Sequence, residues 1–304
     1  MSSEKKQHTV QTTGHAWDGD LQEFNNPLPN WWLWGFYATV VFAVIYWVLY
    51  PAFPIGNTYT KGAFNEITYT TADGKTKTSH WTTRALLMQE MQEARELQKP
   101  YLEKINKTGY EQIAGNKEQS SFAYSTAKVL FADNCAACHQ AGGAGVIGMY
   151  PNLADDAWLW GGSYAQIEES IRKGRNGNMP GFKASLSAEQ IDNVAEYVLG
   201  LSGIEVNKDK AAQGKAVFEG AGTCHVCHTK AGSGQFAMGS ANLTDKVWTF
   251  ANVPAAKTLA EKKTAVKEVV ANGFGRHMPA WNGRLSDVEI KMLAFYVHQL
   301  SAGK

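Results

Sequence analysis

The chain has 304 residues, which allows about two domains of ordinary size. Apolar residues make up 44% of the composition, enough for a packed core, and 29 basic residues balance 28 acidic ones to a net charge of +1. A chain with so little net charge and no dense basic stretch lacks the electrostatic signature of a nucleic-acid-binding protein. Composition therefore excludes nucleic acid as a partner.

Residues 1–30 are mostly polar, and an uncharged apolar stretch follows at residues 31–53. A helix of that length spans roughly 34 Å, more than the about 30 Å of a bilayer's hydrocarbon core. Tryptophans gather at its start, and Trp47 and Tyr50 stand near its end, as in the aromatic belts of spanning helices. A cleaved signal peptide has a shorter apolar region than this one. We therefore expect an uncleaved transmembrane anchor, and the alternative is a buried core helix.

Residues 54–120 are predicted to form a linker. The segment "ITYTTADGKTKTSHW" alternates around Asp73-Gly74, which indicates a short hairpin. Residues 81–99 have helical amphipathic spacing, and Pro100 is predicted to end that helix. Its apolar face either docks a partner or covers a neighbouring domain of the same chain.

All four cysteines stand in two copies of one pattern, "CAACH" at residues 135–139 and "CHVCH" at residues 224–228. C-x-x-C-H is the attachment signature of c-type haem, in which two thiols bond to the porphyrin and the histidine ligates the iron. The predicted haem-attachment residues are Cys135, Cys138, Cys224 and Cys227, and the predicted iron ligands beside them are His139 and His228.

Two other sites use similar cysteine pairs, and both fit less well. A zinc ribbon places its two pairs about fifteen to twenty residues apart, whereas Cys138 and Cys224 are far more widely separated. A thioredoxin-like pair occurs once and needs no adjacent histidine. Two covalently bound haem c groups are therefore the predicted cofactors.

The sequence around each motif is also duplicated. "PNLADDAWLW" at residue 151 aligns with "ANLTDKVWTF" at residue 241, and "MPGFKASLSAEQIDNVAEYVLGLS" aligns with "MPAWNGRLSDVEIKMLAFYVHQLS". Each copy ends in a predicted helix that begins with a capping box, Ser187 with Gln190 and Ser286 with Glu289. We predict two tandem domains, at residues 121–203 and 204–304.

Each copy resembles a class I cytochrome c domain, which implies an all-α fold after the single transmembrane helix. The family takes its second iron ligand from a Met-Pro before the last helix, and Met179 and Met278 stand there. The resemblance also implies that the Pro151 carbonyl supports His139; the second copy departs from it with Ala241. Met149 and Met238 are predicted to be packing residues, and an exchange of methionines between the two copies stays open.

Residues 17–34, "WDGDLQEFNNPLPNWWLW", closely resemble the N-terminal segment of subunit III of cbb3-type cytochrome c oxidases. That resemblance covers the whole chain and implies an electron-transfer subunit without catalytic residues of its own, in a proton-pumping respiratory complex of the bacterial inner membrane. Its implied partners are a donor cytochrome c, the monohaem cytochrome subunit and the haem–copper subunit that reduces oxygen.

The cofactor also predicts the topology, because haem c is attached outside the bacterial cytoplasm. Residues after 53 should be periplasmic and residues 1–30 cytoplasmic. Two other functions remain open: an anchored dihaem cytochrome of another dehydrogenase or reductase, and a dihaem peroxidase. The peroxidase needs one haem without a tight second ligand, whereas paired His and Met ligands favour electron transfer.

Overall fold

The computed structural model describes residues 11–71 and 73–301 of the chain. The chain divides into two compact units, Met1–Gln98 and Lys99–Lys304, which are described separately. Both candidate haem motifs belong to the second unit.

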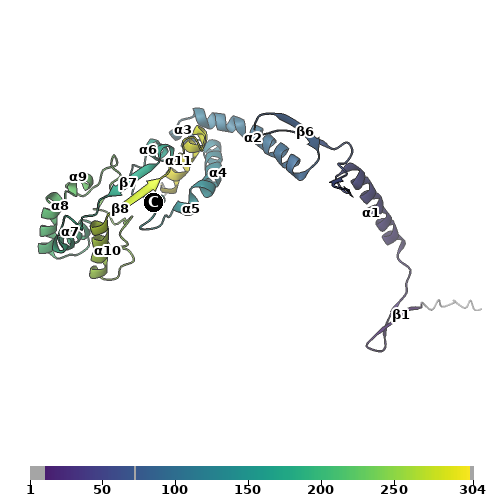
Figure 1. Ribbon diagram of the computed structural model, residues 1–304, viewed down its shortest axis with the longest axis horizontal. Coiled ribbons are helices and arrows are strands. Elements are labelled where there is room, and N and C mark those ends of the chain that lie inside the picture. The colour runs from purple at the N-terminus through teal and green to yellow at the C-terminus, as the bar shows by residue number, and fades with distance from the viewer. Residues whose placement is uncertain (1–10, 72, 302–304) are drawn as a thin grey trace, which may run out of the picture. The chain divides into compact units, whose positions relative to one another are not determined.

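In the first unit, the apolar stretch forms helix α1, Asn30–Leu49 (Figure 1). It has no buried residue and, among the described helices, is the one that is long and apolar enough to cross a membrane. The helix ends earlier than predicted because Tyr50 is extended, with φ −119° and ψ 156°. The proline ring of residue 51 disfavours helical backbone at the residue before it.

The rest of the first unit contains three short antiparallel strand pairs among its described residues. The predicted hairpin around Asp73-Gly74 is confirmed, with Glu66 opposite His80 and Thr70 opposite Thr76. A hairpin before α1 was not predicted. The strands are β1 Thr12–Trp17, β2 Leu21–Phe24, β3 Pro54–Ile55, β4 Thr58–Tyr59, β5 Glu66–Thr70 and β6 Thr76–His80.

Helix α2 spans Thr83–Lys107, so the prediction that Pro100 ends it is wrong. A proline inside a helix removes one backbone hydrogen bond. The turns after it, which already belong to the second unit, are held by burial instead, because Ile105 is part of a hydrophobic core of that unit, at 1% exposed, and Leu102 packs against the same core. Tertiary packing outweighs the local penalty.

The second unit repeats one order of elements: a helix, a one-turn helix at the C-x-x-C-H motif, a helix, a strand and a last helix. The predicted capping boxes form at Ser187 and Ser286. Because strands occur in both units, the predicted all-α class is not confirmed. The elements are α3 Tyr110–Gly115, α4 Lys117–Asn134, α5 Ala136–His139, α6 Tyr164–Lys173, β7 Arg175–Met179, α7 Ala188–Leu201, α8 Lys208–Glu219, α9 His225–His228, α10 Leu259–Asn272, β8 Phe274–Met278 and α11 Asp287–Ser301.

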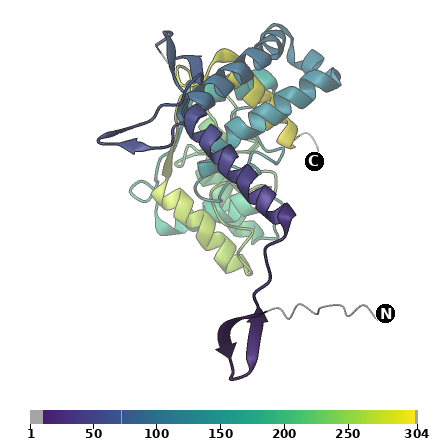
Figure 2. The same cartoon turned by 90° about the vertical axis from the view of Figure 1, so that its right-hand side faces the viewer.

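Two hydrophobic cores form in this unit, and each combines segments of both sequence repeats. The first core joins α4 and α6 of the first repeat to α11 of the second. The second core joins α8 and α10 of the second repeat to α7 of the first. Figures 1 and 2 show α11 beside α4, far along the chain from it. The last helix of each repeat therefore packs on the other repeat.

A two-stranded antiparallel ribbon, β7 with β8, lies between the two groups of helices (Figure 1). Gly177 pairs with Arg276 at its centre, and Arg175 pairs with Met278 and Met179 with Phe274 at its ends. Residues directly opposite one another lie on the same face of a ribbon. Both candidate methionine ligands therefore lie on one face, which is the less exposed face of each strand.

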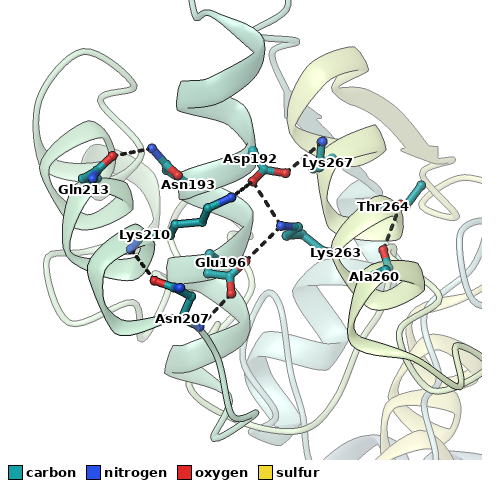
Figure 3. A network of polar contacts seen from close by, with 10 residues as sticks. All are labelled: Asp192, Asn193, Glu196, Asn207, Lys210, Gln213, Ala260, Lys263, Thr264 and Lys267. Carbon is teal, nitrogen blue, oxygen red and sulfur yellow. Dashed lines mark hydrogen bonds and ion pairs between the residues drawn. The ribbon is translucent and has the colours of Figure 1, made fainter.

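Polar contacts also join the two repeats. Figure 3 shows Asp192 on α7 with three lysines around it: Lys210 on α8 at 3.2 Å, and Lys263 and Lys267 on α10 at 3.0 Å each. Lys263 also contacts the buried Glu196 at 3.2 Å. These ion pairs cross from the first repeat to the second and reinforce the second core.

Candidate haem-binding sites

Each C-x-x-C-H motif forms one helical turn. The backbone N–H of His139 donates to the carbonyl of Cys135 at 2.9 Å, and that of His228 donates to Cys224 at 2.9 Å. Residues three and four apart share one face of a helix. The turn therefore presents two thiols and an imidazole together, as covalent attachment and iron ligation require.

Backbone carbonyls orient both imidazoles. The Nδ1 of His139 lies 3.1 Å from the Pro151 carbonyl oxygen, and that of His228 lies 2.9 Å from the Ala241 carbonyl oxygen. An Nδ1–H that donates there leaves Nε2 free as a metal ligand. Burial lowers the pKa of both histidines because it disfavours the imidazolium form. Ala241, which stands where the first repeat has Pro151, keeps this hydrogen bond because the acceptor is a backbone carbonyl oxygen.

The thiols differ from the reactive thiols of a redox site. Burial raises the pKa of Cys135 and of Cys224 to about 11 each, whereas reactive thiols have a lowered pKa. Within residues 11–71 and 73–301, no three His, Cys, Asp or Glu side chains gather in a way that would hold a metal ion. The neighbourhood suits attachment to a porphyrin better than zinc binding.

Both motifs line one cavity of about 770 Å³. Its walls are mainly apolar and aromatic, and they include Trp158 and Trp248, the tryptophans of the duplicated segments. Two thiols and one imidazole at each motif, facing an apolar space, fit a covalently bound haem. Seven of the predicted site residues line it together with Met179 and Met278: Cys135, Cys138, His139, Pro151, Cys224, Cys227 and His228.

Each candidate methionine lies beside the candidate haem motif of the other repeat, on the same hydrophobic core. Met278 of the second repeat packs against the first core, and so does Cys135 of the first repeat. Met179 of the first repeat packs against the second core, and so does Cys224 of the second repeat. The structure thus brings each methionine to the core that carries the other repeat's motif.

Sequence reasoning missed the arginines of the ribbon. Arg175 and Arg276 both line the cavity, and no motif marks them. Burial lowers the pKa of Arg276 to about 10, which leaves it charged at neutral pH. Met149 and Met238, which are predicted to be packing residues, also line the cavity.

Two C-x-x-C-H turns with oriented imidazoles at an apolar cavity define a c-type cytochrome. A family model described as "Cytochrome C oxidase, cbb3-type, subunit III" matches residues 123–198 and 209–297. A model of the N-terminal domain of cytochrome oxidase-cbb3, FixP, matches residues 9–57. The chain belongs to the family of subunit III of cbb3-type cytochrome c oxidases.

Curated relatives match over nearly the whole chain. The Cbb3-type cytochrome c oxidase subunit FixP of Azorhizobium caulinodans is 41% identical over 302 residues, covering 96% of this chain and 94% of that protein. Subunit CcoP of Azospirillum sp. (strain B510) is 38% identical, covering 97% and 96%. Subunit CcoP of Cereibacter sphaeroides is 35% identical, covering 96% and 95%.

Proposed function

We propose that this chain is a membrane-anchored dihaem c-type cytochrome that carries electrons into a cbb3-type cytochrome c oxidase. The observation that carries the proposal is the pair of C-x-x-C-H turns at one apolar cavity, in a chain whose relatives are named as oxidase subunits. The chain is an electron-transfer subunit and does not itself reduce oxygen. Its haem-binding repeats are residues 121–203 and 204–304, after a linker at residues 54–120.

The proposed iron ligands are paired across the repeats. His139 and Met278 would hold the haem attached at Cys135 and Cys138, and His228 and Met179 would hold the other. The packing of each methionine on the opposite core supports this pairing. The carbonyls of Pro151 and Ala241 would keep each histidine in the tautomer that binds iron.

Each haem, when bound, supplies a one-electron redox centre. The apolar and aromatic walls would keep water away from it, and the imidazoles of His139 and His228 and the sulfurs of Met278 and Met179 would hold the iron. Ligation by both a histidine and a methionine would raise the reduction potential and would leave no ligand position for a substrate. The chain's residues therefore bind and tune the electron carrier and perform no chemistry on a substrate.

The proposed place of this subunit is the bacterial inner membrane, with α1 (Asn30–Leu49) as a single anchor, residues 1–30 in the cytoplasm and the haem domains in the periplasm. Electrons would enter from a donor cytochrome c and pass to a monohaem cytochrome subunit. From there they would reach the haem–copper subunit, which reduces oxygen and pumps protons. The uncharged apolar composition of α1 supports the anchor.

The function is tested on the chain purified from its native membranes in mild detergent. The haem content per chain is measured by the pyridine haemochrome method, and cyanide-sensitive oxygen uptake is measured with a reduced cytochrome c donor. We expect two c haems per chain, together with b-type haem, copper and uptake in the same preparation. Two c haems without b haem or uptake would instead identify a carrier of another respiratory complex.

The crossed pairing has its own test, in a chain that keeps only the first haem because Cys224 and Cys227 are replaced by serine. In this background Met278→Leu should abolish the absorption band of the iron–methionine bond. Met179→Leu, the matched control, should leave that band in place. The opposite result would show that each repeat supplies its own methionine.

A further inference from the structure

Arg276 is a half-buried cation at the centre of the β7–β8 ribbon. It lies two residues before Met278 on β8, and its cross-strand partner Gly177 lies two residues before Met179 on β7. By register the arginine thus lies two positions from each candidate methionine ligand, along its own strand for Met278 and diagonally across the ribbon for Met179. The position paired with it has no side chain, and a Cβ built there would meet nothing within 4 Å.

The contacts of Arg276 within the chain hold its side chain in place but do not balance its charge. Its Nη2 donates to the Thr249 carbonyl at 2.8 Å, and the guanidinium carbon lies 4.2 Å from the ring centre of Phe250 and 5.6 Å from that of Phe274. Its Nε is buried without a hydrogen-bond acceptor. The ion pairs formed by the described residues include none to Arg276.

Arg175, the other arginine of the ribbon, is satisfied within the chain. Its Nη1 lies 3.8 Å from Glu169, and its Nε donates to the hydroxyl of Ser170 at 2.9 Å. A guanidinium stays protonated in proteins, and a buried charge without a counter-ion is strongly unfavourable. The difference between the two arginines indicates that Arg276 receives its anion from outside the polypeptide.

The cavity indicates the chemical class of that anion. Arg276 lines the same space as both C-x-x-C-H motifs and both methionines. A haem carries two carboxylates, its propionates, and the planar fork of an arginine matches a carboxylate with two parallel hydrogen bonds. No lining residue offers Arg276 a carboxylate at ion-pair distance in the described part of the chain.

We propose that Arg276 is the counter-ion of haem propionate in the shared cavity and that its single charge raises the reduction potentials of both haems. The inference rests on the proposed function, since it requires bound haem. A fixed positive charge favours the reduced iron, which carries one positive charge less, and burial strengthens the effect because few waters screen it. Its central register position makes the effect common to both haems.

The test is a redox titration of the dihaem chain with the variant Arg276→Gln, after its haem content has been measured. We expect the equilibrium constant for reduction of both haems to fall about tenfold, which is about 59 mV for a one-electron couple. The matched control is Arg284→Gln, which removes the same charge from an exposed arginine beside Trp281 and outside the cavity. We expect the control to keep the wild-type potentials.

The outcomes distinguish a failure of the proposed role of Arg276 from a failure of the proposal that the chain binds haem. Wild-type protein without c-type haem would refute the proposed function itself. Wild-type potentials in a haem-loaded Arg276→Gln variant, or a fall at one haem alone, would overturn the shared role of Arg276.

A third variant covers the case in which Arg276→Gln does not retain haem. Arg276→Lys keeps the charge but loses the planar fork. Haem content and potentials close to wild type in this variant would support the counter-ion role. Haem loss equal to that of Arg276→Gln would instead assign Arg276 to packing against Phe250 and overturn the proposal.

Discussion

Replacement of Asp192 by asparagine should test how the two repeats are joined. The carboxylate accepts ion pairs from Lys210, Lys263 and Lys267, three lysines of the second repeat (Figure 3). Asparagine keeps the size of the side chain and removes its charge. The substitution therefore reports on the ion pairs without opening a cavity.

The magnitude follows from the exposure of each pair. Asp192 and Lys263 are 19% and 21% exposed, so we assign this pair about 1 kcal/mol, the upper end for exposed pairs. Lys267 and Lys210 are 38% and 48% exposed, and their pairs contribute about 0.5 kcal/mol each. The free energy of unfolding should fall by about 2 kcal/mol.

The pH dependence has a definite sign. Burial raises the pKa of Asp192, but hydrogen bonds from Lys267, Lys263 and Lys210 outweigh it and hold that pKa well below the usual range. A carboxyl with a lowered pKa in the folded state stabilises the fold above its unfolded pKa of about 4, and the contribution is lost as the pH falls through the folded value. The loss of unfolding free energy caused by Asp192→Asn should thus be constant between about pH 5 and pH 8 and should become smaller below about pH 4.

The assay is urea unfolding of the detergent-solubilised, haem-loaded chain, followed by far-ultraviolet circular dichroism. Urea is preferred to guanidinium chloride because a salt screens ion pairs. Glu205→Gln, which removes an exposed carboxylate between α7 and α8, is the matched control and should be nearly neutral. A loss for Asp192→Asn no larger than that of the control would refute the network as a link between the repeats.

Two further substitutions test the cores and the ribbon. Phe131→Ala, at a side chain 1% exposed in the first core, should cost about 3–5 kcal/mol of unfolding free energy in the same assay, and a loss below about 1 kcal/mol would contradict that core. Gly174 has φ +68° and ψ −179°, and a Cβ added there would clash with the Met278 carbonyl. Gly174→Ala should therefore lower the free energy of unfolding by at least about 2 kcal/mol and weaken the iron–methionine absorption band. Gly275→Ala, on the more exposed face of the same ribbon with open space at its Cβ, is the control that should keep both the stability and the band.

The local features of the chain were readable from the sequence because each depends on residues close together. The capping boxes at Ser187 and Ser286 need only a hydroxyl and an acceptor three residues later, and both form. The hairpin around Asp73-Gly74 needs only a turn between alternating strands. The helix through Pro100 was missed because the burial of Ile105, far from any local signal, stabilises it.

The sequence by itself determined the two C-x-x-C-H turns, the duplicated segments and the uncharged apolar helix, because spacing and composition along the chain are sufficient for each. Only the tertiary structure decided that the last helix of each repeat, α7 or α11, packs on the other repeat and not on its own. Helices α7 and α11 begin with equivalent capping boxes and have equivalent apolar faces, so either suits either partner by sequence. The crossing arises from long-range contacts: the β7–β8 pairing, the Asp192 ion pairs and the two shared cores, in which segments far apart in the chain bury one another's apolar surface.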